Sequence, residues 1–401
     1  MSAPVDVLQR FPAPRRPEDP FAMPEEYRRL FDGQRLPRVM LPAGKTCHLV
    51  GRYDDVQQVM SGPFSSDGRH PGFPTARAGA PSTSASLSFF RMDGPEHRRY
   101  RTKVTPYFTV ARLHSMEAGV RRAVDELLDG LGGTTGSADL AAQLALPLPS
   151  MVICQILGVP YADREYFYRL IDVMARAPEM SPETYRSAIV ELRSYIEELA
   201  VAKRNDPGDD LLSGLVQAFD DDPELDPPQL AAMVLLLLVA GQETTASMIS
   251  FGALALMTFP EARAALDDDA AVPGVVEELL RFLSIAQWMP RVATEDVELG
   301  GRMVQAGEGV VVLPIVANRD PDVFADPDRL DVTRANAHRH LACGFGPHQC
   351  LGLQLARLEL RVVYSALFRR LPGLRLAVPV DGLPFRQNTA FFSVDSLPVQ
   401  W

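Results

Sequence analysis

One ten-residue stretch, CGFGPHQCLG at residues 343–352, combines residue types that can bind a soft metal ion. Its cysteine, Cys350, follows His348 by two residues and is surrounded by glycines. A thiolate rather than a thiol is the metal ligand, and it needs electropositive surroundings. Gly344 and Gly346 permit positive φ and close backbone approach, so backbone N–H groups can point at the sulfur. The stretch therefore predicts a site that holds one thiolate.

A helical pattern, LGLQLARLELRVVYSALFRRL, begins directly after Cys350, with Gly352 at its start. The dipole of a helix favours an anion at its N-terminus, which supports a thiolate at this position. No second cysteine lies at chelating spacing, so a single thiolate indicates an iron whose other ligands come from a cofactor, and haem meets that requirement. The competing interpretation is a buried cysteine in a glycine-rich turn.

A second stretch, AGQETT at residues 240–245, lies inside a long apolar helical pattern. Ala240 and Gly241 are small enough for the helix to approach a flat macrocycle and leave room for dioxygen. Thr244 can donate a hydrogen bond to the carbonyl four residues earlier and open the helix locally. Glu243 can relay protons if it is partly buried. Without the cysteine stretch, an ordinary helix with unremarkable threonines would explain these residues equally well.

These stretches resemble the characteristic motifs of the cytochrome P450 family, in which a cysteine thiolate binds haem iron. GFGPHQCLG matches the haem-binding loop, and AGQETT matches the oxygen-activating stretch of the long central helix. EELLR supplies Glu278 and Arg281, the E-x-x-R pair of the family. PEHRRYR gives His97 and Arg101, which resemble its haem-propionate contact. The order and spacing of the motifs fit from about residue 20 to Trp401.

The resemblance implies haem b as the cofactor, with Cys350 as the axial iron ligand and Glu243 and Thr244 as catalytic residues that manage protons. PRVATEDVELGG and HRHLACGFG place Arg291 and His340 where the family has further propionate partners. Buried carboxylates such as the haem propionates require charge-assisted partners. The implied cofactor-binding set is therefore His97, Arg101, Ala240, Gly241, Arg291, His340, Gly344, His348 and Gly352.

Glu278 and Arg281 are three residues apart on one helix face, so they could form a plain ion pair within the helix. Such a pair stabilises a surface helix by only about 0.3–0.5 kcal/mol. The resemblance instead implies a buried charge network that braces the cysteine loop. In that case the loss of one partner costs about 3–5 kcal/mol. We expect both residues to be structural rather than catalytic.

Cys343 is a departure from the family pattern, because phenylalanine usually stands seven residues before the cysteine ligand. The usual aromatic ring packs beside the thiolate, so its replacement can change the hydrogen bonding of the sulfur or the haem reduction potential. The alternative is a substitution that the fold tolerates without consequence.

The substrate pocket and the surface for redox partners rest on the resemblance alone. No flavin-binding fingerprint is visible, so the resemblance implies electrons from a ferredoxin and its NAD(P)H-dependent reductase. A basic face could bind an acidic ferredoxin, and its candidate residues are Arg98, Arg99, Arg357 and Arg361. An ordinary solvated surface explains these four arginines equally well. The implied pocket walls are residues 68–92, the central helix before Gly241, SIAQW and NTAFF. The candidate contacts within them are Phe89, Phe90, Val239, Ile285, Trp288, Phe391 and Phe392. Each of these residues could also be an ordinary part of the hydrophobic core.

The elements that must position these residues are mainly helical. Helical patterns dominate from residue 95 to 290, and the longest runs from Pro228 to Met257; it is apolar nearly all round, so it should be buried centrally. Shorter helices are expected at 23–31 and 53–60, and strands on either side of the turn near residue 43 and around Gly300-Gly301. Residues 68–88 show no periodicity. The fold class is mainly α with a small β portion, as a cytochrome P450 fold with its long central helix over haem. We expect a single domain over 1–401, with 1–20 irregular.

Composition excludes several classes of protein. The 401 residues carry a net charge of −11, which argues against general nucleic-acid binding. The apolar run AAMVLLLLVAG is too short to cross a bilayer, and the proline-rich start does not resemble a signal peptide. We therefore expect a soluble, cytoplasmic, monomeric monooxygenase acting on a small molecule of secondary metabolism. Two alternatives stay open: a peroxide-driven haem peroxygenase and a non-catalytic thiolate-haem sensor.

Overall fold

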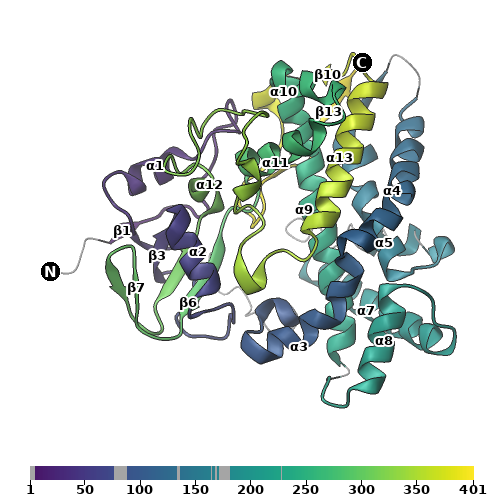
Figure 1. Cartoon of the computed structure of the whole chain (residues 1–401), viewed down its shortest axis with the longest axis horizontal. Helices are drawn as coiled ribbons and strands as arrows, with labels where there is room; N and C mark the ends of the chain where they lie inside the picture. Colours follow the sequence, from purple (N-terminus) through teal and green to yellow (C-terminus); the bar gives the residue numbers. More distant parts are fainter. Residues whose placement is uncertain are drawn as a thin grey trace.

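The long helices and the main sheet occupy opposite sides of the molecule (Figure 1). The larger side gathers the long helices around α9, and the smaller side combines the main sheet with α1 and α2 (Figure 1). The segment that leads into α13 lies between the two sides (Figure 1). The computed structural model describes residues 5–75, 88–132, 136–163, 165–167, 169–170, 181–226 and 228–401.

The helices that shape the larger side follow the patterns expected from the sequence. Expected helices at 23–31, 53–60, 228–257 and after Cys350 are confirmed, and their ends either match or are shifted by one or two residues. The α-helices are α1 (Glu25–Phe31), α2 (Tyr53–Ser61), α3 (Gly94–Val104), α4 (Val110–Gly130), α5 (Pro147–Leu157), α7 (Pro182–Asn205), α8 (Leu211–Asp221), α9 (Pro228–Thr258), α10 (Pro260–Ala264), α11 (Val272–Leu283), α12 (Pro314–Ala317) and α13 (Leu353–Arg370).

Helix α9 is the central element of the larger side. It begins at Pro228, where the missing N–H of proline is tolerated, and it ends ahead of Pro260, which disfavours helical geometry at the residue before it. It packs against α5, α7 and α13. Among the described residues it is the one helix long and apolar enough to cross a membrane by composition, yet 61% of its apolar window is buried inside the protein. It is the core helix that the sequence predicts.

The main sheet has six strands in the order β1-β2-β3-β9-β6-β4, and it carries one residue of the candidate site on β6. Strand β9 lies parallel to β3 and antiparallel to β6, so segments about 260 residues apart in sequence are joined. The expected strands near residue 43 and around Gly300-Gly301 are confirmed. The strands are β1 (Asp6–Val7), β2 (Arg38–Met40), β3 (Thr46–Val50), β4 (Phe64–Ser65), β5 (Ser137–Asp139), β6 (Met289–Ala293), β7 (Val297–Leu299), β8 (Arg302–Val304), β9 (Gly309–Val312), β10 (Arg375–Leu376), β11 (Phe385–Arg386), β12 (Ser393–Val394) and β13 (Pro398–Gln400).

A small C-terminal hairpin, β11–β12, lies against α9. The segment between its strands is fastened to the chain after α11: Phe392 N–H donates to the Ile285 carbonyl at 2.8 Å, and Gln287 N–H donates to the Ala390 carbonyl at 2.8 Å. The side chain of Gln287 also donates to the carbonyls of Gln387 and Thr389. These hydrogen bonds join SIAQW and NTAFF, the two predicted pocket segments, into one wall. Of the predicted loop at 68–88, residues 76–87 lie outside the described residues.

Candidate active site

Cys350 lies between the single turn Gly346–His348 and the start of α13. Its backbone N–H donates to the Cys343 carbonyl at 2.9 Å, which closes the loop. Gly344 and Gly346 have φ angles of +72° and +70°, in the region that favours glycine. A Cβ atom on Gly346 would also lie 2.7 Å from the Met60 carbonyl oxygen of α2. The glycines are therefore required by the path of the loop.

The surroundings of the Cys350 sulfur favour its anionic form. A hydrogen bond from the Cys343 side chain has the largest effect, and the N–H groups of Gly352 and Leu353 and the Arg101 guanidinium act in the same direction. They outweigh the opposing effect of burial and lower the pKa of Cys350 to about 7. The chain surrounds this sulfur, yet Cys350 retains exposed surface, so one side of it faces open space. The sequence indicated that Cys343 could change the hydrogen bonding of the sulfur, and the structure identifies the Cys343 side chain as the donor.

Three of the predicted cationic residues meet near the start of α3. The ring of His97 stacks on that of His348, with centroids 4.2 Å apart. His97 is buried, and burial together with the charges of His348 and Arg101 lowers its pKa to about 4, so it is neutral at pH 7. Its Nε2 atom has no hydrogen-bond partner among the described residues. Buried polar atoms are rarely left unpaired, so this nitrogen indicates a ligand.

Arg101 and Arg291 border the same group. Arg101 donates to the Gln349 carbonyl beside the cysteine, at 2.5 Å. Arg291, on β6, is only 6% exposed and donates to the carbonyl of Pro290 at 2.8 Å. Burial lowers the pKa of Arg291 to about 10, and no ion pair offsets this effect within the described part of the chain. A buried, unpaired guanidinium is a strong binding site for a carboxylate.

Asp93 is an acidic member of this group that the sequence reasoning missed. It directly precedes α3, and its carboxylate accepts hydrogen bonds from Ser65, Ser66 and His348. Burial alone would raise the pKa of Asp93, but these hydrogen bonds hold it well below its ordinary value. Asp93 therefore orients His348. The only sequence signal was an acid just before a proline-containing helix start, which is normally a capping residue.

His340 lies in a different ion pair. Its Nε2 atom is 3.5 Å from the Glu277 carboxylate of α11, which also binds Arg357 of α13. Hydrogen bonds from His340 and Arg357 outweigh burial and lower the pKa of Glu277 to about 2. The structure thus groups His97, Arg101, Arg291 and His348, whereas the propionate contact expected for His340 stays a prediction.

Helix α9 presents an open face at the middle of its length. Ala240 is exposed, although most of the helix is buried, so open space lies beside it. The Thr244 hydroxyl donates to the Ala240 carbonyl at 2.7 Å, as the sequence predicted. Gly241 faces another way, because a Cβ atom there would lie 3.6 Å from Ile153 of α5. Ala240 and Thr244 border the open space, and the small size of Gly241 serves the packing of α9 on α5.

Glu243 is partly buried and has a basic neighbour. Burial raises the pKa of Glu243; the Arg386 charge opposes this effect, and the Asp395 charge reinforces it. Arg386, on β11, lies 3.5 Å from Glu243 and 2.7 Å from Asp395. The C-terminal hairpin therefore holds the cation beside the predicted acid, an arrangement that no local pattern in the sequence could indicate.

Glu278 and Arg281 form the centre of a buried network. Both side chains are fully buried, and Arg281 donates two hydrogen bonds of 2.7 Å to Glu278. Arg281 also donates to the carbonyls of Asn318, Pro327 and Arg329. The surface-pair interpretation is thus excluded by geometry.

The network reaches the cysteine loop through Asn318. This side chain accepts a hydrogen bond of 2.7 Å from the N–H of Leu341 and donates one of 2.8 Å to Ser284. Leu341 lies two residues before Cys343, so the buried ion pair and the cysteine loop share one set of hydrogen bonds. These hydrogen bonds are a physical basis for the bracing role that the resemblance implies.

The predicted pocket residues divide into two groups. Phe89, Ile285 and Phe392 are buried in the main core, where Phe392 contacts Phe251 and the guanidinium of Arg15. Trp288 packs edge-on against Phe11, in a separate core cluster beside the sheet. The residues with free surface are Phe90, Val239 and Phe391, together with Trp288, which is only partly buried by its cluster.

The residues present fit a bound haem. Cys350, an exposed residue whose sulfur is favoured as a thiolate, can supply the iron ligand. The unpaired Nε2 of His97 and the unpaired guanidinium of Arg291 can hold propionates. Ala240 leaves open space on α9 for a flat group and dioxygen. The sulfur, the groups that can hold propionates and the exposed surface at Ala240 thus all meet the requirements of a bound haem.

Comparison with known proteins leads to the same family that the sequence motifs resemble. A cytochrome P450 family profile matches residues 182–373. Cytochrome P450-SU2 of Streptomyces griseolus is 45% identical, covering 100% of this chain and 98% of its own length. Pentalenic acid synthase of Streptomyces avermitilis is 42% identical, covering 100% and 98%. The crystal structure of cytochrome P450 MoxA from Nonomuraea recticatena superposes with a TM-score of 0.90 at 42% identity, covering 97% of this chain and 98% of that one.

Proposed function

Because this chain belongs to the cytochrome P450 family, we propose that it is a haem-thiolate monooxygenase that oxidises a small organic molecule in secondary metabolism. Oxidoreductase and monooxygenase activity follow from the family. The observation that carries the proposal is Cys350, whose sulfur is favoured as an anion and faces open space beside unpaired buried cations. The relative that makes pentalenic acid, by its name, supports a secondary metabolite as the substrate class.

Haem, when bound through a thiolate, supplies an iron that activates dioxygen with two electrons and two protons. Cys350 would supply the iron ligand, and the Cys343 carbonyl and the start of α13 hold it in place. His97, Arg101, Arg291 and His348 would bind the propionates. These residues orient the cofactor and keep its charges paired in a buried setting.

Glu243 and Thr244 would deliver protons. Burial raises the pKa of Glu243, which favours its protonated form, and a protonated carboxyl group can donate a proton to a positioned acceptor. The Thr244 Oγ1 atom donates its hydrogen to the Ala240 carbonyl, which leaves its lone pairs free to accept a hydrogen bond from the open side. Oγ1 would thereby hold a proton donor, such as water, on the open side of α9.

The substrate would contact the surfaces of Phe90, Val239 and Phe391, which are partly exposed around the open face of α9. All three are apolar, so they favour an apolar substrate whose orientation depends on shape. Phe391 lies on the wall that hydrogen bonds fasten to the segment after α11. A fixed wall suits selective oxidation of one carbon, because the reacting group must be positioned closely.

Electrons would come from a ferredoxin and its NAD(P)H-dependent reductase. Of the proposed docking residues, Arg99 pairs with Glu224 and Arg357 pairs with Glu277. Arg361 donates to the Arg357 carbonyl, and Arg98 is exposed near the cysteine loop. Arg98 and Arg361 are therefore the better candidates for contact with an acidic partner.

The carbon monoxide difference spectrum of the reduced protein tests the proposal. Thiolate ligation gives the spectrum typical of cytochromes P450, and Cys350→Ser should lose it. Cys47→Ser, at a buried cysteine of β3, is the matched control and should keep it. A protein that takes up no haem, or one whose iron is bound through nitrogen, would refute the proposal.

Turnover experiments separate the alternatives. We expect substrate oxidation with NAD(P)H, reductase and ferredoxin, after a ligand screen has found molecules that move the iron from low to high spin. Turnover with hydrogen peroxide but none with redox partners would instead identify a peroxygenase. Thiolate ligation without any ligand response or turnover would identify a sensor or carrier.

A further inference from the structure

Two guanidinium groups lie on neighbouring segments beside the predicted propionate site. Arg91 donates to the carbonyl of Ser66, the residue after β4, and β4 pairs antiparallel with β6, the strand of Arg291, with Ser65 opposite Val292. Arg91 ends the short 3-10 turn Ser88–Arg91, and Arg291 lies on β6. Burial lowers the pKa of both groups, and the charge of Arg91 contributes to lowering that of Arg291. Two like charges in a buried setting repel each other, so the arrangement is unfavourable unless an anion joins it.

The contacts of both arginines are with neutral groups. Arg91 donates to the Ser66 carbonyl at 3.1 Å and lies 5.0 Å from the ring centres of Phe73 and Phe90. Arg291 donates only to the carbonyl of Pro290. Within the described ranges, neither arginine has a carboxylate within ion-pair distance.

The carboxylates nearest to this pair are already occupied. Asp93 accepts hydrogen bonds of 2.5 Å from Ser65, 2.9 Å from the Ser66 hydroxyl and 3.2 Å from His348. Asp67, the other acid near Arg91, forms an ion pair of 2.7 Å with Arg69. Residues 76–87, which lie outside the described part of the chain, contain no Asp or Glu in their sequence. The missing anion must therefore come from elsewhere.

The balance of charge indicates what that anion is. Of the guanidinium groups that border this region, Arg101 faces the Cys350 sulfur, which favours its charged form. Arg91 and Arg291, in contrast, have only Asp67 and Asp93 as acidic neighbours among the described residues, and both of these bind other groups. His97 is neutral at pH 7 and leaves Nε2 unpaired. Arg91 and Arg291 thus carry positive charge that a carboxylate between them would offset.

We propose that Arg91 and Arg291 together bind one carboxylate, and that this carboxylate is a propionate of haem. Arg91 would thus be a cofactor-binding residue outside the set that the family motifs supply. The inference rests on the proposed function, because it requires haem. A carboxylate group on a substrate has the same chemistry, and Phe90, which lies against Arg91, is a candidate pocket residue, so the experiment must separate the two sources.

The first experiment follows haem transfer from the holoenzyme to an excess of apomyoglobin. We expect Arg91→Gln to speed haem release by about tenfold or more, since a hydrogen bond to a charged group contributes on the order of 1.5–3 kcal/mol. Arg91→Lys keeps the positive charge, so its rate of haem release should lie between those of the wild type and Arg91→Gln. The matched control is Arg69→Gln, an exposed arginine that pairs with Asp67, and it should leave the rate unchanged. Thermal unfolding of each holoenzyme shows whether the variant is folded.

The second experiment replaces haem with its dimethyl ester, which lacks the negative charges. If Arg91 binds a propionate, wild type and Arg91→Gln should release the ester at equal rates, because the interaction is already absent. A difference between them that persists with the ester would show that Arg91 acts through packing, and would overturn the proposal.

A third measurement tests the substrate as the source of the carboxylate. Long-chain fatty acids and their amides are compared as ligands by the spin-state shift of the iron. If Arg91→Gln leaves haem release unchanged but weakens acids at least fivefold relative to amides, the carboxylate belongs to the substrate and the assignment to haem is wrong. If Arg91→Gln changes neither the rate of haem release nor the binding of acids relative to amides, Arg91 and Arg291 do not form a carboxylate site. Failure of the wild type to bind haem would refute the proposed function instead.

Discussion

The acidity of Cys350 arises from individual donors around one sulfur. The N–H groups at the start of α13 belong to any loop of this shape, but the donor with the largest effect is the side chain of Cys343. The same hydrogen bond and burial raise the pKa of Cys343 far above its usual value, so this thiol keeps its proton and acts as the donor. The departure from the family pattern therefore has a physical consequence at the ligand.

Removal of this donor should lower the haem reduction potential. A hydrogen bond to a thiolate withdraws electron density from it, which favours the reduced iron. One hydrogen bond of about 1 kcal/mol corresponds to roughly 40 mV for a one-electron couple, so Cys343→Ala and Cys343→Phe should both shift the potential downward by that order. Redox titration measures it, with Cys47→Ala as the control. An unchanged potential would mean that the substitution is neutral.

Loss of the Thr244 hydroxyl should waste reducing equivalents. Without Oγ1 the proton donor on the open side of α9 is no longer held, so Thr244→Ala should consume NAD(P)H while a larger fraction of the oxygen leaves as hydrogen peroxide. Thr258→Ala is a matched control on α9, because the Thr258 hydroxyl also donates to the carbonyl four residues earlier, at 2.8 Å. Equal peroxide yield in both variants would remove the role assigned to Thr244.

Single elements carry functional residues to their places. Helix α9 is buried over most of its length, so its exposed middle marks the site more clearly than any motif does. The hairpin β11–β12 fastens the pocket wall and holds Arg386 between Glu243 and Asp395. Helix α11 supplies the buried pair that leads to the cysteine loop. Each element thus couples the site to a different part of the chain.

Arg386 should set the pH range in which Glu243 works. The charge of Arg386 lowers the pKa of Glu243 against burial and Asp395, so Arg386→Gln should raise that pKa further. If protonated Glu243 is the donor, coupled turnover falls as pH rises through its pKa, and in the variant this fall should move to higher pH. The measurement is the ratio of product to NAD(P)H consumed against pH. Arg375→Gln, at an exposed arginine of β10, is the control and should leave the profile unchanged.

Glu278→Gln should destabilise the protein strongly. It leaves Arg281 charged and buried with fewer partners, which costs about 3–5 kcal/mol. Glu197→Gln is a matched control, because Glu197 also pairs with an arginine on its own helix but is exposed; its loss should cost below about 0.5 kcal/mol. Thermal and denaturant unfolding measure both. Similar effects of the two changes would contradict the network described for α11.

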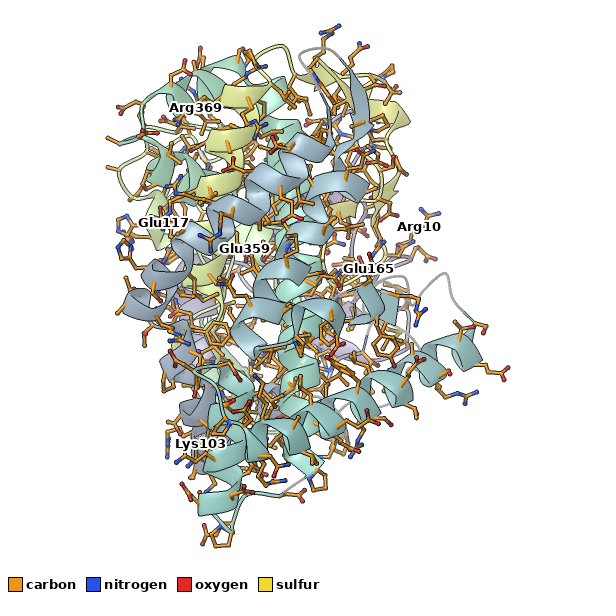
Figure 2. The ribbon with its side chains drawn as sticks, turned by 90° about the vertical axis from the view of Figure 1, so that its right-hand side faces the viewer. Arg10, Lys103, Glu117, Glu165, Glu359 and Arg369 are labelled. Carbon is orange, nitrogen blue, oxygen red and sulfur yellow. The ribbon has the colours of Figure 1, made fainter. Side chains whose placement is uncertain are left out.

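At the scale of the whole molecule, the core contains an acid with no charged partner. Glu359 of α13 is 1% exposed, and Figure 2 shows it in the middle of the helical side, away from the edges. Its Oε2 atom has no hydrogen-bond partner among the described residues, and burial raises the pKa of Glu359 from 4.5 to about 8. The packing of the helices, rather than any local motif, produces this state.

Glu359 should make stability depend on pH. Its pKa in the folded state lies above its unfolded value, so ionisation opposes folding: the protein loses stability as pH rises from about 4.5, and the loss levels off near pH 8. Glu359→Gln should remove this loss and gain on the order of 2–4 kcal/mol at pH 8. Denaturant unfolding at pH 5 and pH 8 measures the difference.

Glu117 provides the matched control, because it lies on α4 at the edge of the same view (Figure 2). A hydrogen bond from Arg121 lowers the pKa of Glu117, so Glu117→Gln should not stabilise the protein at high pH. If Glu359→Gln gave no larger gain at pH 8 than at pH 5, the carboxyl group would have a partner or water that keeps it ionised.

The sequence by itself determined what depends on neighbouring residues. Residue order in CGFGPHQCLG was enough to predict a lone thiolate at a helix start, because glycine conformation and the helix dipole act within a few residues. The apolar pattern of α9 predicted a buried helix, and the i−4 hydrogen bond of Thr244 followed from helix geometry. Family resemblance supplied haem and the roles of distant motifs.

Only the tertiary structure decided contacts between segments far apart in the sequence. It turned Gly241 toward α5, paired His340 with Glu277, and brought Arg386 to Glu243 across more than a hundred residues. It also brought Arg91 close to Arg291. The strength of a charge interaction depends on burial and on what else lies nearby, and both are set by packing of the whole chain. For this reason the ligand could be predicted from one loop, whereas the groups that tune it could not.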